Sequence, residues 1–555
     1  VVTEVAVNIL GIHVAGSGKY GLSQPLPPSK FEEIKKVLAN DTSLDYDVEV
    51  KNIEMKHIGQ SVTPVVANFA HTVSKNTSLV PSAIFSGDPV RAPANLSCLG
   101  VGTVKEMEKK KFEHVKQVDP LAMDFAAKIV SRIIPEFESI SIKEVVLGRP
   151  DTEGKPAIGK LNNKSSNGFG YRASKQDLID FETGECKPEL LTKLEQVQRD
   201  IIDCKVDLKD FVATVQLKDE QRPIEKVDKP RVFDVLPLHL IMLQKKIFAD
   251  MCVKIQKERF NNGIMVGINV YSEWDKLEYM LSQTGCKMFD GDVGKWDGHM
   301  LPQVMFRVSS MIMDKFRFIN ENERKIAHAL LMTMIYCPTL CLNETVFTNH
   351  AMPSGTYLTA IFNSLVNKFY VAYAYYKIRE AFDEVANEER FMNSVYSVVY
   401  GDDIVVAVSN DEIQFNALAY AATMKLMGLE FTTAQKTQIT KPYTSIHDVS
   451  FLKRRFVYHK KLERYVGVLD IDTRIGTLDW VSDKTRVREL TLDKISGFQR
   501  ENFLDERGQA YEDEIRERCD RNMVPYVKLG ETYLMNLFKT DPDNYNPFSS
   551  NMISY

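Results

Sequence analysis

An α+β fold with an antiparallel sheet is predicted by two stretches of this sequence. Residues 394–409 hold two β-branched, aromatic-rich runs on either side of Gly401-Asp402-Asp403, which is typical of a β-hairpin with a tight turn. Gly401 supplies the positive φ that such a turn requires. Residues 352–373 begin as a Pro-Ser-Gly loop and continue as an apolar helix. A helix and an antiparallel hairpin therefore follow one another along the chain.

The hairpin carries a second, adjacent carboxylate in front of the apolar run Ile404-Val405-Val406. Turn chemistry does not account for it, and a charge beside a buried strand is costly unless something compensates it. A divalent cation is the usual compensation. The alternative is a surface turn that holds two acids, because Asp and Gly are both common in turns. These residues alone leave both interpretations open.

Composition sets broad limits on the class of protein. The 555 residues have room for several cores or one large body, and 44% hydrophobic with 26% charged residues is ordinary for a globular protein. The formal net charge of -5 gives no indication of nucleic acid, so a nucleic-acid enzyme would have to gather its basic residues locally. No apolar run is long enough to span a bilayer, and no signal-peptide pattern opens the chain.

The 8 cysteines form no paired framework. Cys337 and Cys341 lack matching partners for a zinc site, so we expect reduced thiols in the core. The chain begins at Val1 instead of Met, as release from a precursor by proteolysis or a trimmed chain would give.

The stretch at residues 288–297 invites comparison with a calcium loop, since Asp290 and Asp292 fit the first two ligands of an EF-hand. That interpretation fails because Lys295 replaces the turn glycine and Leu301 stands where the bidentate Glu belongs. What remains is Asp292 at the end of a short apolar strand. Asp297 follows five residues later, beyond a Gly-containing bend.

Basic residues alternate with acids along residues 218–231. These are Lys218, Arg222, Lys226, Lys229 and Arg231. The stretch is either a surface ribbon held by its own ion pairs or a cationic wall for a triphosphate. The Ser/Asn/Gly loop at residues 163–171 encloses an aromatic side chain, and such a loop is able to hold a single-stranded template by small polar contacts and stacking.

Further polar residues stand in or near apolar elements. Ser354 and Thr359 are able to cap the helix that follows them. Asn363 lies inside that helix, and because Asn is a poor helix former its presence there suggests a specific role. Residues 417–427 predict an amphipathic helix with Gly428 as its C-cap. Lys436 follows, and residues 451–456 alternate enough to predict a strand with basic residues on one side.

These stretches combine into one candidate site. Asp292 on a strand and Asp402 on a hairpin tip could jointly hold two divalent cations, which activate an attacking 3′-hydroxyl and stabilise the leaving pyrophosphate. The order of motifs is Lys-Asp-Glu-x-Arg, Asp-x4-Asp, Ser-Gly-x3-Thr-x3-Asn, Tyr-Gly-Asp-Asp, a later Lys and Phe-Leu-Lys-Arg. From about residue 75 to 456 the chain thereby resembles the RNA-dependent RNA polymerases of picorna-like positive-strand viruses. The long first segment resembles the insect-infecting iflaviruses or dicistroviruses.

The resemblance implies a closed right hand of fingers, palm and thumb, with an antiparallel palm sheet and an N-terminal extension. It implies the following boundaries: extension 1–72, fingers with an index finger 73–249, palm 250–333, a fingers insertion 334–351, palm 352–457, and thumb with a C-terminal tail 458–555.

The resemblance also assigns roles by position. The metal ligands would be Asp292 and Asp402 with Asp403 in support, and Lys436 would donate a proton to pyrophosphate. The nucleotide-binding residues would be Lys218, Arg222, Lys226, Arg231, Asp297, Ser354, Gly355, Thr359 and Asn363. RNA would contact Ser165, Ser166, Gly168, Phe169, Lys453 and Arg454.

The implied cofactor is Mg²⁺, for which Mn²⁺ can substitute. The implied partners are an RNA template and primer, ribonucleoside triphosphates and, in some family members, a small genome-linked protein primer. The implied location is the host cytoplasm, at membrane-associated replication complexes.

Two alternatives stay open. A reverse transcriptase has a similar catalytic hairpin, but it typically closes its ribose site with a bulky aromatic, where this chain offers Asp297 and Asn363. A non-catalytic RNA-binding scaffold would show loss of a catalytic acid, and none is missing here.

Overall fold

The computed structural model describes residues 75–96, 118–153, 155–341 and 352–539, together with short strands near the N-terminus and at 344–347. The N-terminal strands form two antiparallel pairs. They are β1 (Val2–Thr3) with β2 (Asn8–Ile9) and β3 (Ile12–Ser17) with β4 (Tyr20–Gln24). Most of the predicted N-terminal extension and the end of the C-terminal tail therefore lie outside the described residues.

The centre of the molecule is a four-stranded antiparallel sheet, which we call the palm sheet. Its order is β13 (Val395–Tyr400), β14 (Asp403–Val408), β10 (Lys287–Val293) and β15 (Phe431–Thr432). Tyr400 pairs with Asp403 across the two-residue turn, in which Gly401 has a φ of 65°. The predicted hairpin is confirmed, and it places Asp402 at its tip.

Both faces of the palm sheet are covered, because alternate side chains of each strand point to opposite faces. Phe289, Ile404 and Val406 pack with the helices α14 (Thr359–Ala381) and α16 (Ala417–Leu426). On the other face Met288 and Val405 pack with Trp274 of α10 (Trp274–Thr284).

The predicted helices are confirmed, with one change of length. Apolar residues surround α14 on all sides, as expected of a buried helix, and it runs past the predicted end at Tyr373 to Ala381. Asn416 caps the start of α16, and Gly428 beyond its end has a φ of 78°.

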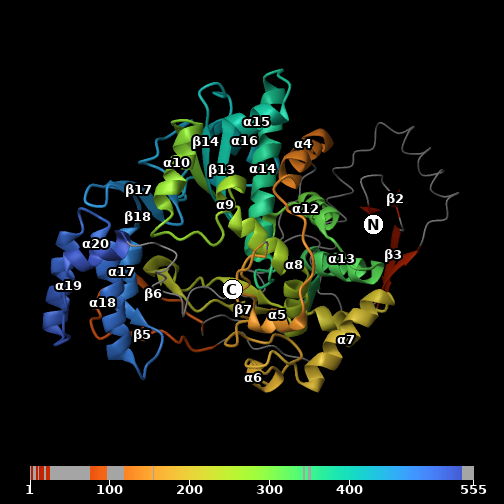
Figure 1. The fold of residues 1–555 in the computed structure, drawn as a ribbon, viewed down its shortest axis with the longest axis horizontal. Coiled ribbons are helices and arrows are strands. Elements are labelled where there is room, and N and C mark those ends of the chain that lie inside the picture. The colour runs from red at the N-terminus through yellow and green to blue at the C-terminus, as the bar shows by residue number, and fades with distance from the viewer. Residues whose placement is uncertain are drawn as a thin grey trace.

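A second sheet lies in the part expected for the fingers (Figure 1). Its order is β12 (Glu344–Phe347), β11 (Pro338–Cys341), β7 (Ala213–Leu217) and β9 (Val232–Val235), and only β7 and β11 run parallel. The accompanying helices and turns are α5 (Ile142–Leu147), α6 (Lys175–Leu178), α7 (Pro188–Ile202), η2 (Leu208–Phe211), η3 (Ile224–Lys226), α8 (Leu238–Lys257) and α13 (Glu321–Ile335).

Shorter helices pack around α14 and the palm sheet. They are α4 (Pro120–Ser131), α9 (Arg259–Asn262), α11 (Trp296–His299), α12 (Pro302–Lys315) and α15 (Glu388–Ser394). α4 lies along α14, and the Asp119 carboxylate at its start accepts from Lys377 of α14 at 2.8 Å (Figure 1).

A three-stranded sheet, which we call the thumb sheet, spans the boundary expected between palm and thumb at residues 457 and 458; its strands are β16 (Ser450–Phe451), β17 (Arg454–His459) and β18 (Arg464–Leu469). The part expected for the thumb continues as α17 (Ile471–Asp479), β19 (Trp480–Val481), α18 (Val487–Phe503), α19 (Gln509–Arg521) and α20 (Glu531–Lys539). The prediction of one strand at residues 451–456 is wrong. Leu452 and Lys453 have φ values of 52° and 59°, and they form a tight turn between β16 and β17.

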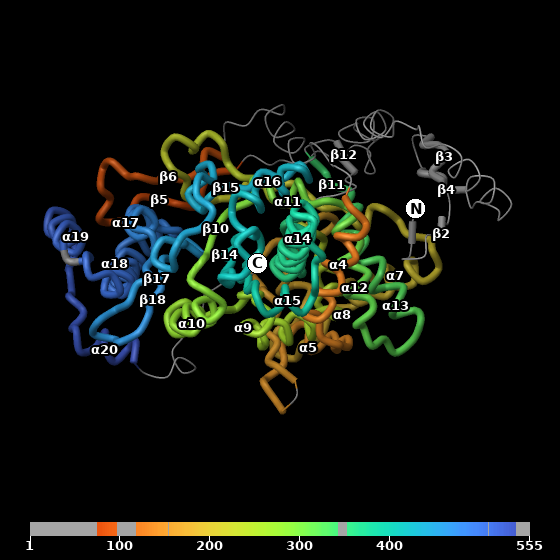
Figure 2. Tube along the Cα trace, turned by 90° about the horizontal axis from the view of Figure 1, so that it is seen from above, coloured from red at the N-terminus to blue at the C-terminus, as the bar shows by residue number. Residues whose placement is uncertain are grey.

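Residues 75–96 join the thumb helices to the fingers. Within them β5 (Val80–Pro81) pairs with β19, and β6 (Arg91–Pro93) pairs with β8 (Gln221–Pro223). Figure 2 shows β5 and β6 running from the thumb helices α17 and α18 toward the centre of the molecule. Residues 75–96 therefore pair with a thumb strand and with a fingers strand, and they connect these two parts of the molecule.

Two sequence expectations are met within the described residues. None of the seven cysteines there forms a disulfide, and Cys252, Cys337, Cys341 and Cys519 are buried. None of the helices in the described part of the chain combines the length and the apolar character needed to cross a membrane.

Candidate active site

Asp292 and Asp402 approach one another at one end of the palm strands, which we call the palm edge. Asp292 stands near the end of β10, and Asp402 occupies the turn between β13 and β14. Burial raises the pKa of Asp402, and the negative charge of Asp292 raises it further. A site that opposes the ionisation of Asp402 beside a second carboxylate favours a cation between the two side chains.

Lys436 already supplies one positive charge there. Its Nζ lies 2.8 Å from Oδ2 of Asp292, and 71% of its side chain is exposed. The residue has a φ of 63° and donates its backbone N–H to the carbonyl of Thr433 at 2.8 Å. The structure therefore places the Lys436 ammonium beside Asp292 and shows that a cation can reach this carboxylate, while the role of Lys436 as a proton donor to pyrophosphate stays a prediction.

Two residues of α14 hold the hairpin turn, and sequence reasoning missed both. The Ser364 hydroxyl accepts the backbone N–H of Gly401 at 2.9 Å. The Asn367 Nδ2 donates to the carbonyls of Gly401 at 2.9 Å and Asp402 at 3.3 Å. The available signal was the presence of four polar residues, Asn363, Ser364, Asn367 and Lys368, within six positions of a largely apolar helix.

Asp403 contacts the segment between β16 and β17. Its Oδ2 accepts the backbone N–H of Leu452 at 2.6 Å, and burial raises its pKa to about 7. Asp290, which the sequence offered only as a failed calcium ligand, behaves in the same way. Its Oδ2 accepts the N–H of Ser450 at 2.7 Å, and burial raises its pKa to about 6.

Asp297 and Asn363 are brought together, as predicted. The Asn363 Nδ2 donates to Oδ1 of Asp297 at 3.2 Å. Trp296 fixes α11 against α14 by packing edge-on to Tyr370, with ring centroids 5.7 Å apart. The Met352 N–H donates to the Asp297 carbonyl at 2.7 Å, which ties the loop at 352–358 to the same place.

Ser354, Gly355 and Thr359 form that loop. The Thr359 hydroxyl lies 3.0 Å from the Thr356 hydroxyl and donates to the Ser354 carbonyl at 3.1 Å. No side chain caps the start of α14, so helix capping is the wrong interpretation of Ser354 and Thr359. A Cβ on Gly355 would stand 2.0 Å from the carbonyl oxygen of Asp234, so only glycine allows this approach to β9.

Glu220 gathers three of the four predicted cations. Lys218 and Arg222 lie 3.7 and 3.5 Å from its carboxylate, and Arg231 forms an ion pair with it. Burial opposes the ionisation of Glu220, but Arg231, together with Lys218 and Arg222, outweighs that effect and lowers the pKa of Glu220.

This cation cluster faces the carboxylates of the palm. Burial lowers the pKa of Lys218, and the charge of Asp297 acts against that shift. The charge of Arg231 likewise acts against the raised pKa of Asp402. Lys226 lies exposed in the turn η3 and is not one of the three cations that the structure pairs with Glu220.

Hydrogen bonds fix the loop at 163–171, and several of its side chains are exposed to solvent. Ser165 accepts from Lys175, and the Ser166 hydroxyl accepts the N–H of Gly168 at 3.1 Å. Gly168 has a φ of 69°, and a Cβ there would lie 2.4 Å from the carbonyl oxygen of Leu236. Both serines are exposed and Phe169 is half-buried, so the loop can still meet an RNA strand.

Lys453 and Arg454 have opposite environments. Lys453 is exposed at the tip of the turn, where burial of its ammonium and then the charge of Arg91 lower its pKa. Arg454 is 7% exposed and donates to both carboxylate oxygens of Glu501, at 2.6 and 2.8 Å. A guanidinium so enclosed does not reach an RNA strand, so the prediction for Arg454 is corrected to a buried ion pair.

The carboxylates fit a magnesium site that substrate would complete. No group of three or more His, Cys, Asp and Glu side chains within the described residues is arranged to hold a metal alone. Mg²⁺ keeps several waters and is usually bound through one or two carboxylates plus substrate phosphates. Asp292 and Asp402 match that requirement, while Asp403 has one oxygen engaged by Leu452.

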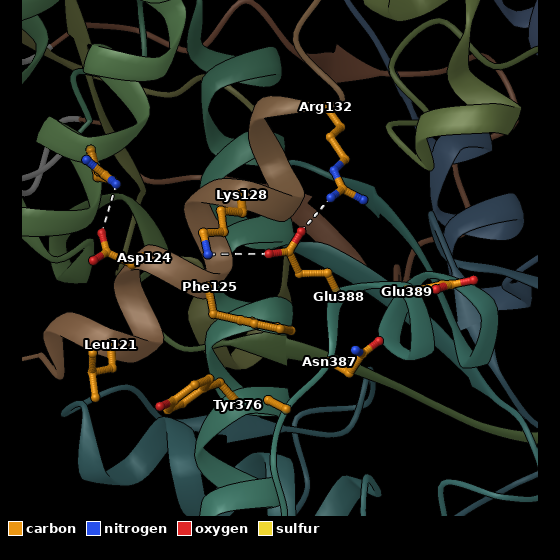
Figure 3. Close-up of a pocket in the computed structure, with 11 residues that line it drawn as sticks. Leu121, Asp124, Phe125, Lys128, Arg132, Tyr376, Asn387, Glu388 and Glu389 are labelled. Carbon is orange, nitrogen blue, oxygen red and sulfur yellow. Dashed lines mark hydrogen bonds and ion pairs between the residues drawn. The ribbon is translucent and has the colours of Figure 1, made fainter.

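A separate pocket of about 850 Å³ lies on the outer side of α14, between α4, α12 and α15 (Figure 3). Lys128 and Arg132 pair with Glu388 across it, and Arg307 pairs with Asp124 at 2.9 Å. None of the predicted site residues lines it. Most of the charged side chains that line this pocket pair with one another. The candidate active site is therefore the group of carboxylates at the ends of the palm strands, not this pocket.

Comparison with known proteins points the same way. The sequence profile of the family described as "Viral RNA-dependent RNA polymerase" matches residues 101–517. The chain is 25% identical to the replicase polyprotein of Drosophila C virus over 89% of its own length and 28% identical to that of cricket paralysis virus over 65%. It spans only 31% and 22% of those polyproteins. Both viruses belong to the dicistroviruses that the sequence resembles.

A solved structure shares the fold. The Sicinivirus 3Dpol RNA dependent RNA polymerase superposes with a TM-score of 0.72 at 18% identity. The match covers 86% of this chain and 98% of the other. The closed right-hand fold that the sequence predicted is confirmed.

Proposed function

This chain belongs to the family of viral RNA-dependent RNA polymerases, and from that premise we propose that it joins ribonucleoside triphosphates on an RNA template during replication of a viral RNA genome. One observation carries the proposal. Asp292 and Asp402 meet at the palm edge, with Lys436 2.8 Å from Asp292 and the charge of Arg231 acting on Asp402.

The two carboxylates are the groups that would hold Mg²⁺ or Mn²⁺. Divalent cations bound there supply activation of the primer 3′-hydroxyl and stabilisation of the leaving pyrophosphate. Burial raises the pKa of Asp402, and a cation would offset that penalty, so binding of metal and nucleotide is favoured together.

The chain's own cations orient the triphosphate. Arg231 and Arg222 offer forked donors that match phosphate oxygens, and Lys218 offers a point charge. All three contact Glu220 in the structure, which keeps them in place before nucleotide arrives. Lys436, exposed beside Asp292, is placed to give its proton to the departing pyrophosphate.

Asp297 and Asn363 select the sugar. They come from α11 and α14 and share a hydrogen bond, so they form one polar wall in an otherwise apolar region. A ribose 2′-hydroxyl can donate to one and accept from the other, and this group distinguishes RNA from DNA.

The loop at 163–171 (the template loop), the turn tip at Lys453, and the cations Lys218, Arg222 and Arg231 (the nucleotide cations) would surround the primer–template. A small genome-linked protein as primer and a location at membrane-associated replication complexes in the host cytoplasm stay predictions of the resemblance.

Primer extension on an RNA template, with ribonucleotides and deoxyribonucleotides compared at equal Mg²⁺, tests the proposal. We expect ribonucleotide incorporation and strong rejection of deoxyribonucleotides. Preferred incorporation of deoxyribonucleotides would indicate a reverse transcriptase. RNA binding without incorporation of either would indicate a scaffold.

A further inference from the structure

The strand β16 is docked on the palm by two carboxylates. Residues of an antiparallel pair alternate between those that exchange backbone hydrogen bonds and those that do not. Phe451 and Arg454 close the tight turn, so the N–H groups of Ser450 and Leu452 point away from β17. Asp290 of β10 accepts the first at 2.7 Å, and Asp403 of β14 accepts the second at 2.6 Å.

The two acceptors lie on the same face of the palm sheet as Asp292. Asp290 and Asp292 are two residues apart on β10, and side chains two apart on a strand share a face. By register, Asp290 stands opposite Val405 and Asp403 begins the same strand. The carboxylate that holds Ser450 is therefore the immediate neighbour, along one strand, of the carboxylate expected to hold metal.

The turn that these bonds hold is strained. Leu452 and Lys453 both have positive φ, although neither is Gly or Asn. Such residues persist only where the surroundings over-determine them. Phe451 and Phe456 pack on Trp274 with centroids 6.3 and 5.0 Å away, which fixes the base of the hairpin and leaves its tip to the carboxylates.

The tip also reaches the nucleotide cations. Arg91 and Arg231 both act to lower the pKa of Lys453, so the three positive groups share one region. Figures 1 and 2 show β17 and β18 beside α10, where the thumb sheet meets the palm. A shift of β16 against β10 would move Lys453 relative to Asp292 and Asp402.

We propose that Asp290 is a positioning residue for nucleotidyl transfer, which sets the distance between the β16–β17 tip and the carboxylate pair. The inference rests on the proposed function, in which this tip contacts the primer end. Asp290 touches neither substrate nor metal in this role. It acts through the Ser450 N–H, and an uncharged side chain that still accepts that hydrogen bond should replace it.

Two variants of Asp290 and one control test this. Asp290→Asn keeps an acceptor oxygen of nearly the same shape, and Asp290→Leu removes it. Asp448→Leu is the matched control, because Asp448 accepts only from Ser445 at 2.8 Å and Thr444 at 3.4 Å within its own loop. Primer extension is measured against primer–template concentration and against Mg²⁺ concentration, alongside the melting temperature.

Asp290→Leu should raise the primer–template KM about tenfold or more, the usual consequence of losing a hydrogen bond to a charged group. The Mg²⁺ concentration for half-maximal rate should stay unchanged. Asp290→Asn and Asp448→Leu should stay within about twofold of the wild type, as substitutions that break no buried contact usually do.

Three results would overturn the proposal. Equal damage by Asn and Leu with a shifted Mg²⁺ requirement would make Asp290 a metal-site carboxylate. A lower melting temperature with an unchanged primer–template KM would make it a residue of stability only. If Asp290→Leu does not fold, Asp290→Ala is measured in its place. Failure of both variants to fold would also make Asp290 a residue of stability only. A wild-type protein that extends no primer would refute the proposed function instead.

Discussion

At the residue scale, Asn363 shows how a buried polar group prepares for a ligand. The side chain is 5% exposed, and its Nδ2 is used by Asp297. Its Oδ1 is buried and has no hydrogen-bond partner among the described residues. A buried acceptor left unpaired costs about 1–3 kcal/mol, which a donor on the nucleotide would recover.

Asn363→Ala should therefore reduce the preference for ribonucleotides over deoxyribonucleotides. A site built around a hydroxyl rejects the analogue that lacks it, because buried polar groups are then left unpaired. The measurement is the ratio of incorporation of the two nucleotides, with the melting temperature recorded beside it.

Asn416→Ala is the matched control, since Asn416 caps α16 by accepting from Leu418 and Ala419 far from the ribose pair. Its loss should reduce stability by about 1 kcal/mol and leave the sugar preference intact. If Asn363→Ala gave the same pattern, Asn363 would be structural and its role in sugar choice would be refuted.

Lys436→Leu should slow the chemical step about a hundredfold or more, as expected when a general acid is removed. Binding of nucleotide should change little, because we propose that Arg231, Arg222 and Lys218 hold the triphosphate. Single-turnover rates at saturating nucleotide measure the step, with the exposed Lys441→Leu as control. An unchanged rate in Lys436→Leu would leave Lys436 as a surface cation only.

Residue types and spacing predicted the groups that we propose to face substrate, but not the groups that hold them. Asp297 lies beside Asn363, and Lys436 lies beside Asp292. Asp290 escaped prediction because its partner is a backbone N–H supplied from 160 residues away. Arg454 was misassigned because the turn uses Leu452 and Lys453 at positive φ, where sequence rules expect Gly or Asn.

At the scale of single elements, α14 organises the site along one face of its length. Asn363 contacts Asp297, and Ser364 and Asn367 hold the hairpin turn. Lys368, the residue after Asn367, reaches the edge strand β13. The Lys368 Nζ donates to the carbonyl and hydroxyl of Ser397, both at 2.8 Å. The helix was predictable from its apolar pattern, whereas its function as a brace depends on which backbone atoms lie opposite.

Lys368 should give the fold a measurable dependence on pH. Burial lowers its pKa to about 7, far below the usual value near 10. Between these values the unfolded chain binds the proton and the folded chain does not, so the free energy of unfolding rises with pH. This stabilisation is complete above the unfolded pKa and is lost as pH falls through about 7.

Lys368→Met removes that term. The melting temperature of the variant minus that of the wild type should therefore be more positive at pH 6.5 than at pH 9, without divalent cations. Lys425→Met, on an exposed part of α16, should show the same difference at both pH values. A pH-independent difference for Lys368→Met would mean that the ammonium stays charged in the folded protein.

At the scale of the whole molecule, residues 75–96 hold the thumb helices to the fingers. Arg518 of α19 pairs with Asp479 at 2.5 Å and donates to the carbonyl of Ile84 at 2.6 Å. The same Asp479 carboxylate accepts the N–H of Ser86 at 2.8 Å. These partners stand about 400 residues apart in sequence, so no local pattern announces them.

Arg518→Met should destabilise the protein by about 3–5 kcal/mol, because it leaves the buried Asp479 carboxylate unpaired. The loss should be seen as a lower melting temperature and as faster proteolytic cleavage within residues 75–96. Arg521→Met on the exposed side of the same helix is the control and should behave as wild type. Equal stability of the two variants would show that the connection does not depend on this ion pair.

The proposed nucleotidyl transfer at the ends of the palm strands would depend on Asp402. Its replacement by Asn keeps the side chain's shape and removes the charge that would hold a divalent cation. Single-turnover ribonucleotide incorporation by Asp402→Asn should fall at least about a thousandfold, equivalent to several kcal/mol of transition-state stabilisation, with RNA binding and melting temperature unchanged. Asp411→Asn, at the far end of β14, should keep the wild-type rate. Incorporation by Asp402→Asn near the wild-type rate in Mg²⁺ or Mn²⁺ would contradict the assignment of Asp292 and Asp402 as the reacting centre.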